Sequence, residues 1–131
     1  ILNLMLDLKE RFGLTYVFIS HNFSVVKSFC DDIAVMYLGQ MVERGPADDV
    51  YMKPKHPYTK ALLSAVPIPD PKVAKANKRI VLEGDIPSPI DPPPGCRFKG
   101  RCKEAMKICS EVNPELKEVE TGHFVACHLY K

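Results

Sequence analysis

The sequence predicts an α/β fold for residues 1–66 and an irregular lobe, rich in proline and cysteine, for residues 67–131. In the first part, segments with apolar residues at helical spacing alternate with short runs of β-branched and aromatic residues. In the second part, eight of the twelve prolines fall between residues 67 and 94, and four of the five cysteines lie in the last 36 residues. We therefore expect two domains with a boundary near residue 67.

The chain opens with a predicted helix over residues 1–12, where apolar side chains recur at helical spacing and Gly13 stands in the place of a C-terminal cap. Residues 14–20, LTYVFIS, then form an apolar run rich in aromatic and β-branched residues. Such a run is typical of a strand, and because it is uninterrupted we expect burial on both faces, as in a parallel sheet.

Further elements alternate in the same way up to the predicted boundary, and one more strand is expected among the prolines. Leu38-Gly39-Gln40 indicates a turn that sends the chain back antiparallel. The predicted elements are a helix at about 23–30, a strand at 32–38, an antiparallel return at 41–45, helices at 46–52 and 56–66, and a strand at 78–84.

Composition limits the classes of function. The chain has 131 residues, of which 46% are hydrophobic and 26% charged, as in soluble globular proteins. Its net charge of +2 is too small to argue for a nucleic-acid partner. No apolar run reaches the roughly 18 residues of a membrane helix. The N-terminus lacks the features of a signal peptide and an initiator Met, so we expect a fragment of a longer protein.

Four cysteines, Cys96, Cys102, Cys109 and Cys127, form the first candidate site. An odd total of five without a secretion signal favours a reducing compartment, where clustered thiols bind metal more often than they form disulfides. The spacing C-x5-C-x6-C-x17-C differs from the tight pairs of zinc ribbons, and four thiolates also suit an iron–sulfur cluster. Two disulfides, or four plain thiols, remain alternatives.

Other residues near this cluster have simpler interpretations. His123 and His128 are candidate substitute ligands, but we expect them at the surface. Cys30 is expected to be a small buried apolar residue on a helix face. The bases around the cysteines are expected to form a solvated face and to lower the thiol pKa values. These bases are Arg97, Lys99, Arg101, Lys103 and Lys107.

His21 is the second candidate site, because it follows a predicted strand and precedes a predicted helix. Ligands of open α/β sheets gather at the carboxyl ends of strands, where a histidine can donate to a phosphate or polarise an attacking water. The alternative is a loop histidine that caps the next helix.

Three segments of the sequence carry a resemblance to a known family. The stretch TYVFISHNFSVVKSFCDDIAVMYLGQMVERGP resembles the end of an ABC-transporter ATPase domain, with His21 on the switch histidine. The segments HPYTKALLSAVP and LEGDIPSPIDPPPGCRFKGRC resemble the C-terminal region of the importers for oligopeptides, dipeptides and nickel. The resemblance extends over essentially the whole chain.

The resemblance implies that the chain is the C-terminal portion of such a subunit and carries an incomplete remnant of its parallel sheet. The printed sequence contains no G-x-x-x-x-G-K-[ST] loop, ABC signature or magnesium-binding strand end, so this portion alone is expected to be inactive. In the intact ATPase, which uses ATP and magnesium, His21 would contact the γ-phosphate. Asn22 replaces the aspartate usual in the family and keeps its acceptor oxygen but not its charge.

The same resemblance implies that Cys96, Cys102, Cys109 and Cys127 hold a [4Fe-4S] cluster, with zinc as the alternative. It implies a second ATP-binding subunit and transmembrane permease subunits as partners, at the cytoplasmic face of the cell membrane. The isolated portion is expected to self-associate through apolar surfaces. Two rivals remain: a stand-alone metal-binding interaction module without nucleotide chemistry, and a disulfide-linked extracytoplasmic domain.

Overall fold

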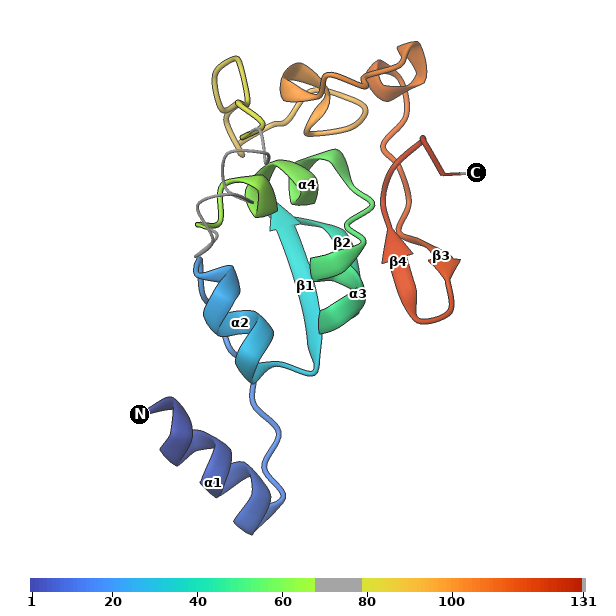
Figure 1. The fold of residues 1–131 in the computed structure, drawn as a ribbon. Coiled ribbons are helices and arrows are strands. Elements are labelled where there is room, and N and C mark those ends of the chain that lie inside the picture. Colours follow the sequence, from blue (N-terminus) through green and yellow to red (C-terminus); the bar gives the residue numbers. More distant parts are fainter. Residues whose placement is uncertain (68–78, 131) are drawn as a thin grey trace.

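The computed structural model describes residues 1–67 and 79–130, and Figure 1 shows their fold. The elements in chain order are α1 (Leu2–Phe12), α2 (Phe23–Phe29), β1 (Asp32–Tyr37), β2 (Gln40–Pro46), α3 (Ala47–Met52), α4 (Pro57–Ser64), the 3-10 helices η1 (Lys99–Arg101) and η2 (Lys107–Ser110), β3 (Lys117–Glu120) and β4 (His123–Val125). The helices predicted from the sequence are therefore confirmed, each within a few residues of its expected ends. None of these helices has the length and apolar character needed to cross a bilayer.

The sheet has the strand order β1-β2-β4-β3, and every neighbouring pair is antiparallel. The turn between β1 and β2 is the predicted one: Leu38 and Gly39 have φ angles of 47° and 75°, the left-handed values that a tight two-residue hairpin requires. Such a short connection can join only antiparallel neighbours. The expected parallel-sheet remnant is therefore wrong for the described residues, although the mixed α/β class is confirmed.

Residues 14–20 are extended but belong to no sheet, which corrects the strand predicted there. Tyr16 and Phe18 pack on Phe29 of α2, with ring centroids 5.8 Å and 5.1 Å away. Val17 and Ile19 point the other way and are 92% and 93% exposed, so burial on both faces is also wrong. An extended segment becomes a strand only when a neighbouring strand pairs with its backbone. Here Leu14 donates its N–H to the Lys9 carbonyl oxygen at the end of α1, at 3.2 Å, and no described residue pairs with the backbone of residues 15–20.

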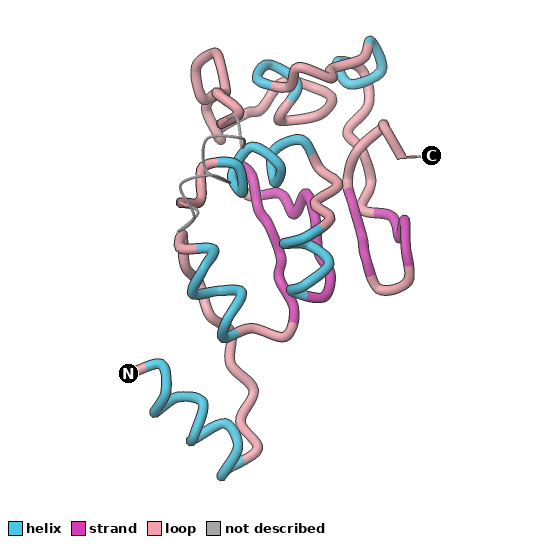
Figure 2. Tube along the Cα trace, viewed as in Figure 1, coloured by secondary structure: helices cyan, strands magenta, loops and turns pink. Residues whose placement is uncertain are grey.

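Two parts of the C-terminal half also differ from the prediction. Residue 78 lies outside the described residues, and residues 79–84 are loop rather than strand, as is most of the region up to β3 (Figure 2). The β3–β4 hairpin was not predicted. Its strands have only 4 and 3 residues, and the charged sequence KEVE of β3 gives no apolar alternation.

The core joins both halves of the chain. On β1 the side chains alternate, so that Ile33, Val35 and Tyr37 are buried while the residues between them face solvent. Phe98, which is 2% exposed, enters this core from the C-terminal half and meets the rings of Tyr37 and Tyr58 at 5.2 Å and 5.4 Å. Together with the β2–β4 pairing, Phe98 attaches the C-terminal half to the hairpin, and the division at residue 67 stays a prediction.

Candidate functional site

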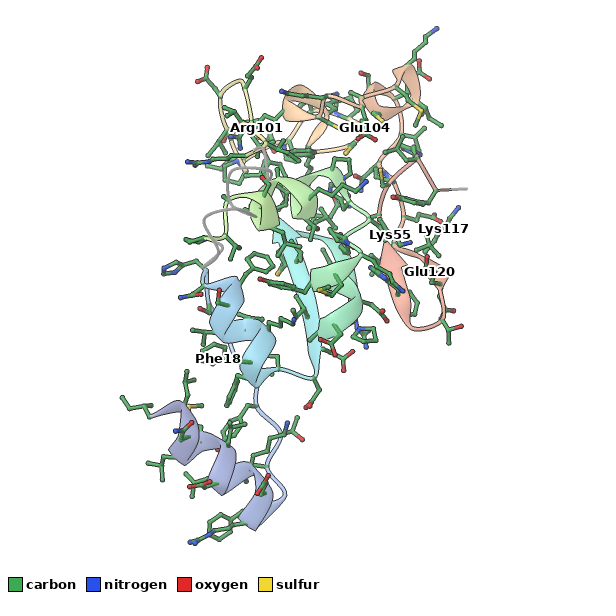
Figure 3. The ribbon with its side chains drawn as sticks, in the orientation of Figure 1. Phe18, Lys55, Arg101, Glu104, Lys117 and Glu120 are labelled. Carbon is green, nitrogen blue, oxygen red and sulfur yellow. The ribbon has the colours of Figure 1, made fainter. Side chains whose placement is uncertain are left out.

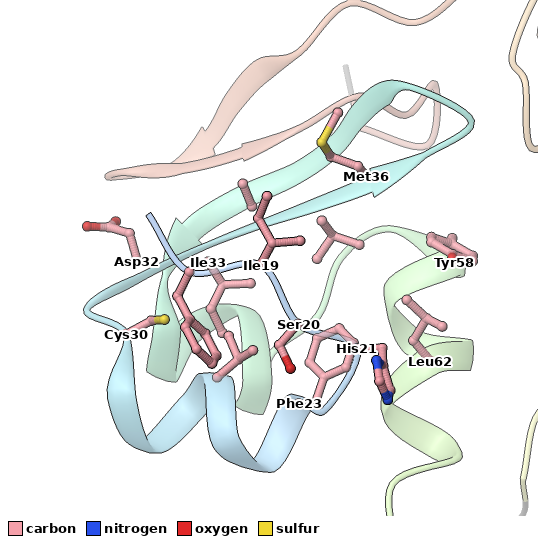
Figure 4. A pocket seen from close by; sticks show the side chains of 14 residues that line it. Ile19, Ser20, His21, Phe23, Cys30, Asp32, Ile33, Met36, Tyr58 and Leu62 are labelled. Atoms are coloured by element: carbon pink, nitrogen blue, oxygen red, sulfur yellow. The ribbon is translucent and has the colours of Figure 1, made fainter. Parts of the chain in front are cut away.

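His21 lies in the loop that leads into α2, on the rim of a cavity of about 410 Å³. Figure 4 shows its ring close to Phe23 and Leu62, which line the same cavity together with residues of β1. The side chain is exposed and makes no hydrogen bond to any residue that the structure describes. With no described residue bonded to it, the exposed ring can meet a ligand from the solvent side.

Asn22, and not His21, caps α2. Its Oδ1 accepts hydrogen bonds from the backbone N–H groups of Ser24 at 3.1 Å and Val25 at 3.3 Å. Its own N–H donates to Oγ of Ser20 at 3.1 Å, which fixes the turn that carries His21. The alternative interpretation of His21 as a helix cap is therefore wrong. An aspartate at position 22 could cap α2 through the same acceptor oxygen, so the cap does not depend on a charge at this position.

The HPYT motif builds the start of α4. His56 is 1% exposed, and its Nδ1 accepts the N–H of Tyr58 at 3.0 Å, while Pro57 occupies the first helical position. Burial lowers the pKa of His56 to about 4, so the imidazole is neutral at pH 7 and able to accept this bond. The motif therefore has a structural role as a cap in the described structure.

A buried carboxylate on β2 connects this motif to the C-terminal hairpin. Glu43 is 0% exposed, and its two oxygens accept the N–H groups of Lys55 at 2.7 Å and His56 at 2.9 Å. Nε2 of His123 on β4 lies 2.8 Å from Oε1 of the same carboxylate. His123 is 1% exposed, so the expectation that it lies at the surface is wrong. Its Nδ1 has no hydrogen-bond partner within the described residues.

The other minor candidates differ in position. His128 is half-buried, and its Nε2 lies 2.9 Å from the carbonyl oxygen of Val112. Cys30 follows the end of α2 and lines the His21 cavity, where burial raises its pKa. It is half-buried rather than fully buried, which corrects the expectation for it in part.

The backbone brings two of the four clustered cysteines together. Cys96 donates its N–H to the carbonyl oxygen of Cys109 at 2.8 Å. Gly95 makes this approach feasible: its φ is 87°, and a Cβ at this position would collide with the same carbonyl. Cys102 follows η1 directly, and Cys127 lies just beyond β4.

The thiols of Cys96, Cys102, Cys109 and Cys127 are near enough to influence one another. Burial raises the pKa of Cys96, and the Cys109 thiol adds to the rise. Burial likewise raises the pKa of Cys102, and that of Cys127 to about 11, with contributions from the other clustered thiols. The expectation that neighbouring bases lower the pKa values is wrong for these three thiols, because burial outweighs the bases.

All five cysteines are free thiols. Across residues 1–67 and 79–130, no group of three or more His, Cys, Asp or Glu side chains is arranged to hold a metal ion. The four clustered thiols therefore share one region without forming a coordination site in their present rotamers.

Comparison with known proteins relates the chain to one family. The family described as "Oligopeptide/dipeptide transporter, C-terminal region" matches residues 42–109. A putative oligopeptide transport ATP-binding protein of Bacillus subtilis, YkfD, is 52% identical over 131 residues, which are 100% of this chain and 40% of that protein.

Two other relatives agree with this result. A putative peptide import ATP-binding protein of Brucella ovis is 50% identical over 127 residues, covering 97% of this chain and 39% of that protein. The dipeptide transport ATP-binding protein DppF of Escherichia coli is 49% identical over 127 residues, covering 97% of this chain and 37% of that protein. The chain thus spans about two fifths of the length of the curated relatives that it matches.

Proposed function

The chain belongs to the family of oligopeptide/dipeptide transporter C-terminal regions, and from this premise we propose that it is the C-terminal part of the ATP-binding subunit of an ABC importer for peptides. The observation that carries the proposal is identity of about half over nearly the whole chain to proteins named for peptide import. Those names favour a peptide cargo over nickel.

In the intact subunit, His21 acts on the γ-phosphate of ATP, with magnesium bound by other residues of the protein. Two features of the described residues support this role. The ring is exposed beside a cavity, and Asn22 rather than His21 caps α2, so His21 neither caps a helix nor bonds another side chain among the described residues. A histidine in this position can donate a hydrogen bond to a phosphate oxygen and help to orient the attacking water.

The partners that go with this function are a second ATP-binding subunit and transmembrane permease subunits at the cytoplasmic face of the membrane. Residues 1–66 would belong to the ATPase domain and residues 67–131 to the C-terminal domain. The 131-residue chain alone is proposed to be inactive, because the printed sequence has no phosphate-binding loop. Its exposed Val17 and Ile19 give it apolar surface through which it self-associates.

Peptide uptake tests the proposal in cells. Deletion of the gene should abolish growth of an amino-acid auxotroph on a dipeptide that contains the required amino acid, and the full-length protein should restore it. Growth on the free amino acid is the control and should not change. Uptake of dipeptide that survives the deletion, in a strain with no other peptide importer, would contradict the proposal.

A second proposal concerns Cys96, Cys102, Cys109 and Cys127, and the gathering of these thiols supports it. These residues would hold a [4Fe-4S] cluster, with zinc as the alternative, after their side chains rotate toward a common centre. Four thiols are a sufficient donor set for either group. Bound there, the group would cross-link the loops of a lobe that contains few regular elements.

Metal analysis of protein purified without oxygen tests this second proposal. Cys→Ser at any one of the four positions should remove the bound iron or zinc, and Cys30→Ser should leave it in place. Protein without metal, whose unfolding midpoint does not change when all four are replaced, would rule the site out. The alternative hypothesis, a stand-alone metal-binding module, requires a reading frame without an upstream phosphate-binding loop. The full gene sequence therefore distinguishes such a module from an ATP-binding subunit.

A further inference from the structure

A second cavity, of about 520 Å³, lies beside α4 and shares no described residue with the His21 cavity. We call it the α4–η1 groove. Its walls come from the first turn of α4, from residues 79–83 and from Arg101, Lys103 and Glu104, and its floor includes the buried ring of Phe98. Figure 3 labels Arg101 and Glu104, which lie on the wall formed by the end of η1 and the loop after it. Neither His21 nor any of the four clustered cysteines is among the described residues that line this groove.

Charged side chains line the groove unequally. The bases are Lys60, Arg79, Arg101 and Lys103, and the acids are Glu83 and Glu104. Lys103 Nζ lies 3.8 Å from an oxygen of Glu83, so these two charges largely offset each other. Among the described residues, the remaining three bases make no ion pair. With Lys103 and Glu83 offset, three positive charges face the single negative charge of Glu104, so the described lining of the groove has a net charge of +2.

Arg101 lines the groove and carries a buried donor that lacks an acceptor among the described residues. Its Nε is shielded from water, yet it has no hydrogen-bond partner within the described residues. A guanidinium donor that loses water without gaining an acceptor is unfavourable by roughly 1–3 kcal/mol, and more when charged. An anion in the groove would supply the acceptor.

The floor of the groove strengthens any such interaction. Phe98 is 2% exposed and packs on the ring of His56 at 5.7 Å and on that of Tyr58 at 5.4 Å. His56 is held neutral because burial lowers its pKa to about 4, so the floor adds no charge. Coulomb attraction to an ion lying on an apolar floor is stronger than in open water.

We propose that the α4–η1 groove binds a phosphate group, with Arg101 as the principal donor and Lys60 and Arg79 as supporting charges. Nε is shielded in the present rotamer, so a rotation of the Arg101 side chain must expose it; the planar guanidinium then offers Nε and one Nη side by side, which matches two oxygens of a phosphate. Three bases without an ion pair to any described residue also suit the dianionic charge of a phosphate monoester better than the single charge of a carboxylate. Glu104 also lines the groove, and its negative charge would repel the additional negative charges of a larger polyanion.

Titration of the ¹⁵N-labelled full chain with inorganic phosphate, at constant ionic strength, tests the proposal. Saturable shifts of amide signals should appear around Lys60, Leu82 and Arg101. Arg101→Gln and Lys60→Gln should each weaken phosphate binding by at least about tenfold, as the loss of a charge-assisted hydrogen bond implies. Lys107→Gln removes the same charge outside the groove and should not change the affinity. The dispersed spectrum of each variant shows whether it is folded.

A second arm identifies the source of the phosphate. Vesicles that contain phosphatidic acid should be bound, and Arg101→Gln should release them, if the group belongs to a lipid. Binding of free phosphate without binding of vesicles assigns the groove to a soluble metabolite, and either result supports the site. The proposal is overturned if no saturable shifts occur near the groove, or if Lys107→Gln weakens binding as much as Arg101→Gln does.

Discussion

Two apolar segments of this chain, residues 14–20 and β1, have similar sequences but different structures. Both are rich in β-branched and aromatic residues. β1 is followed by a tight turn and pairs with β2, so that Ile33 and Val35 are each only 5% exposed. Residues 15–20 have no backbone partner among the described residues, and Val17 remains 92% exposed. The difference shows that the apolar pattern defines an extended segment, whereas a partner close in sequence decides whether it becomes a stable strand.

The β1–β2 hairpin is stabilised further by the buried carboxylate of Glu43 on β2. Removal of this carboxylate should have the largest effect on the free energy of unfolding. Glu43→Ala leaves two backbone donors and His123 without an acceptor in a buried site. We expect a loss of about 3–5 kcal/mol in the free energy of unfolding, as for other broken buried networks. Urea unfolding measures this change.

Glu10→Ala is the matched control, because Glu10 is an exposed glutamate on α1, which projects away from the sheet (Figure 1). It should change the free energy of unfolding by less than about 0.5 kcal/mol. Equal effects of the two substitutions would mean that the Glu43 network does not hold the hairpin to the HPYT motif.

A second prediction concerns the close approach that brings the cysteine loops together. Gly95→Ala should destabilise the chain by about 3 kcal/mol, because its φ of 87° is unfavourable for alanine and the new Cβ would meet the Cys109 carbonyl. Gly100→Ala should cost less than about 1 kcal/mol, since no atom lies within 4 Å of a Cβ there. Thermal unfolding of both variants compares them, and equal midpoints would contradict the packing of residues 95–109.

Acid should weaken the same region through His56. Its pKa is lowered to about 4 in the folded chain, so the unfolded chain binds a proton first as the pH falls below the ordinary value of 6.5. Stability should therefore be full above pH 7 and fall by up to about 3 kcal/mol between pH 6.5 and pH 4. His56→Asn keeps a capping side chain without a titratable group, and it should flatten this part of the curve of unfolding midpoint against pH. A curve that keeps its slope in this variant would assign the titration to other groups.

The smallest effect is expected in the unpaired segment. Val17→Thr and Ile19→Thr should change the free energy of unfolding by less than about 0.5 kcal/mol, because both side chains already face water. The same pair of substitutions should reduce self-association of the isolated chain, which light scattering at several concentrations measures. A loss of several kcal/mol would show that residues 14–20 are buried in the folded chain, and the contrast with β1 would then disappear.

The sequence predicts best where the signals are local. The β1–β2 hairpin follows from its turn, and α4 from its proline and apolar face. The β3–β4 hairpin could not be predicted, because its strands are short and β3 is charged. Pairing in the sheet also depends on neighbours, which the apolar run of residues 14–20 cannot reveal.

The candidate site shows the same limit. His21 and the four cysteines stand out by position and spacing, but their roles remain predictions. The Glu43–His123 pair was missed because its members are 80 residues apart and each alone resembles a surface residue. The local sequence offered little signal, because Glu43 stands between apolar Val42 and charged Arg44. The effect of burial on the thiol pKa values also depends on packing, which a list of nearby bases does not contain.

We propose that this chain is the C-terminal part of an ATP-binding subunit in which His21 takes part in ATP hydrolysis. The rate of ATP turnover by the full-length protein tests this proposal most directly. His21→Ala should lower kcat for ATP at least about 100-fold while changing nucleotide affinity by less than about threefold, as for a group that acts mainly in the transition state. His128→Ala, a half-buried histidine outside the His21 cavity, should leave kcat unchanged. Hydrolysis by the His21→Ala protein within about threefold of the original rate would contradict the claim.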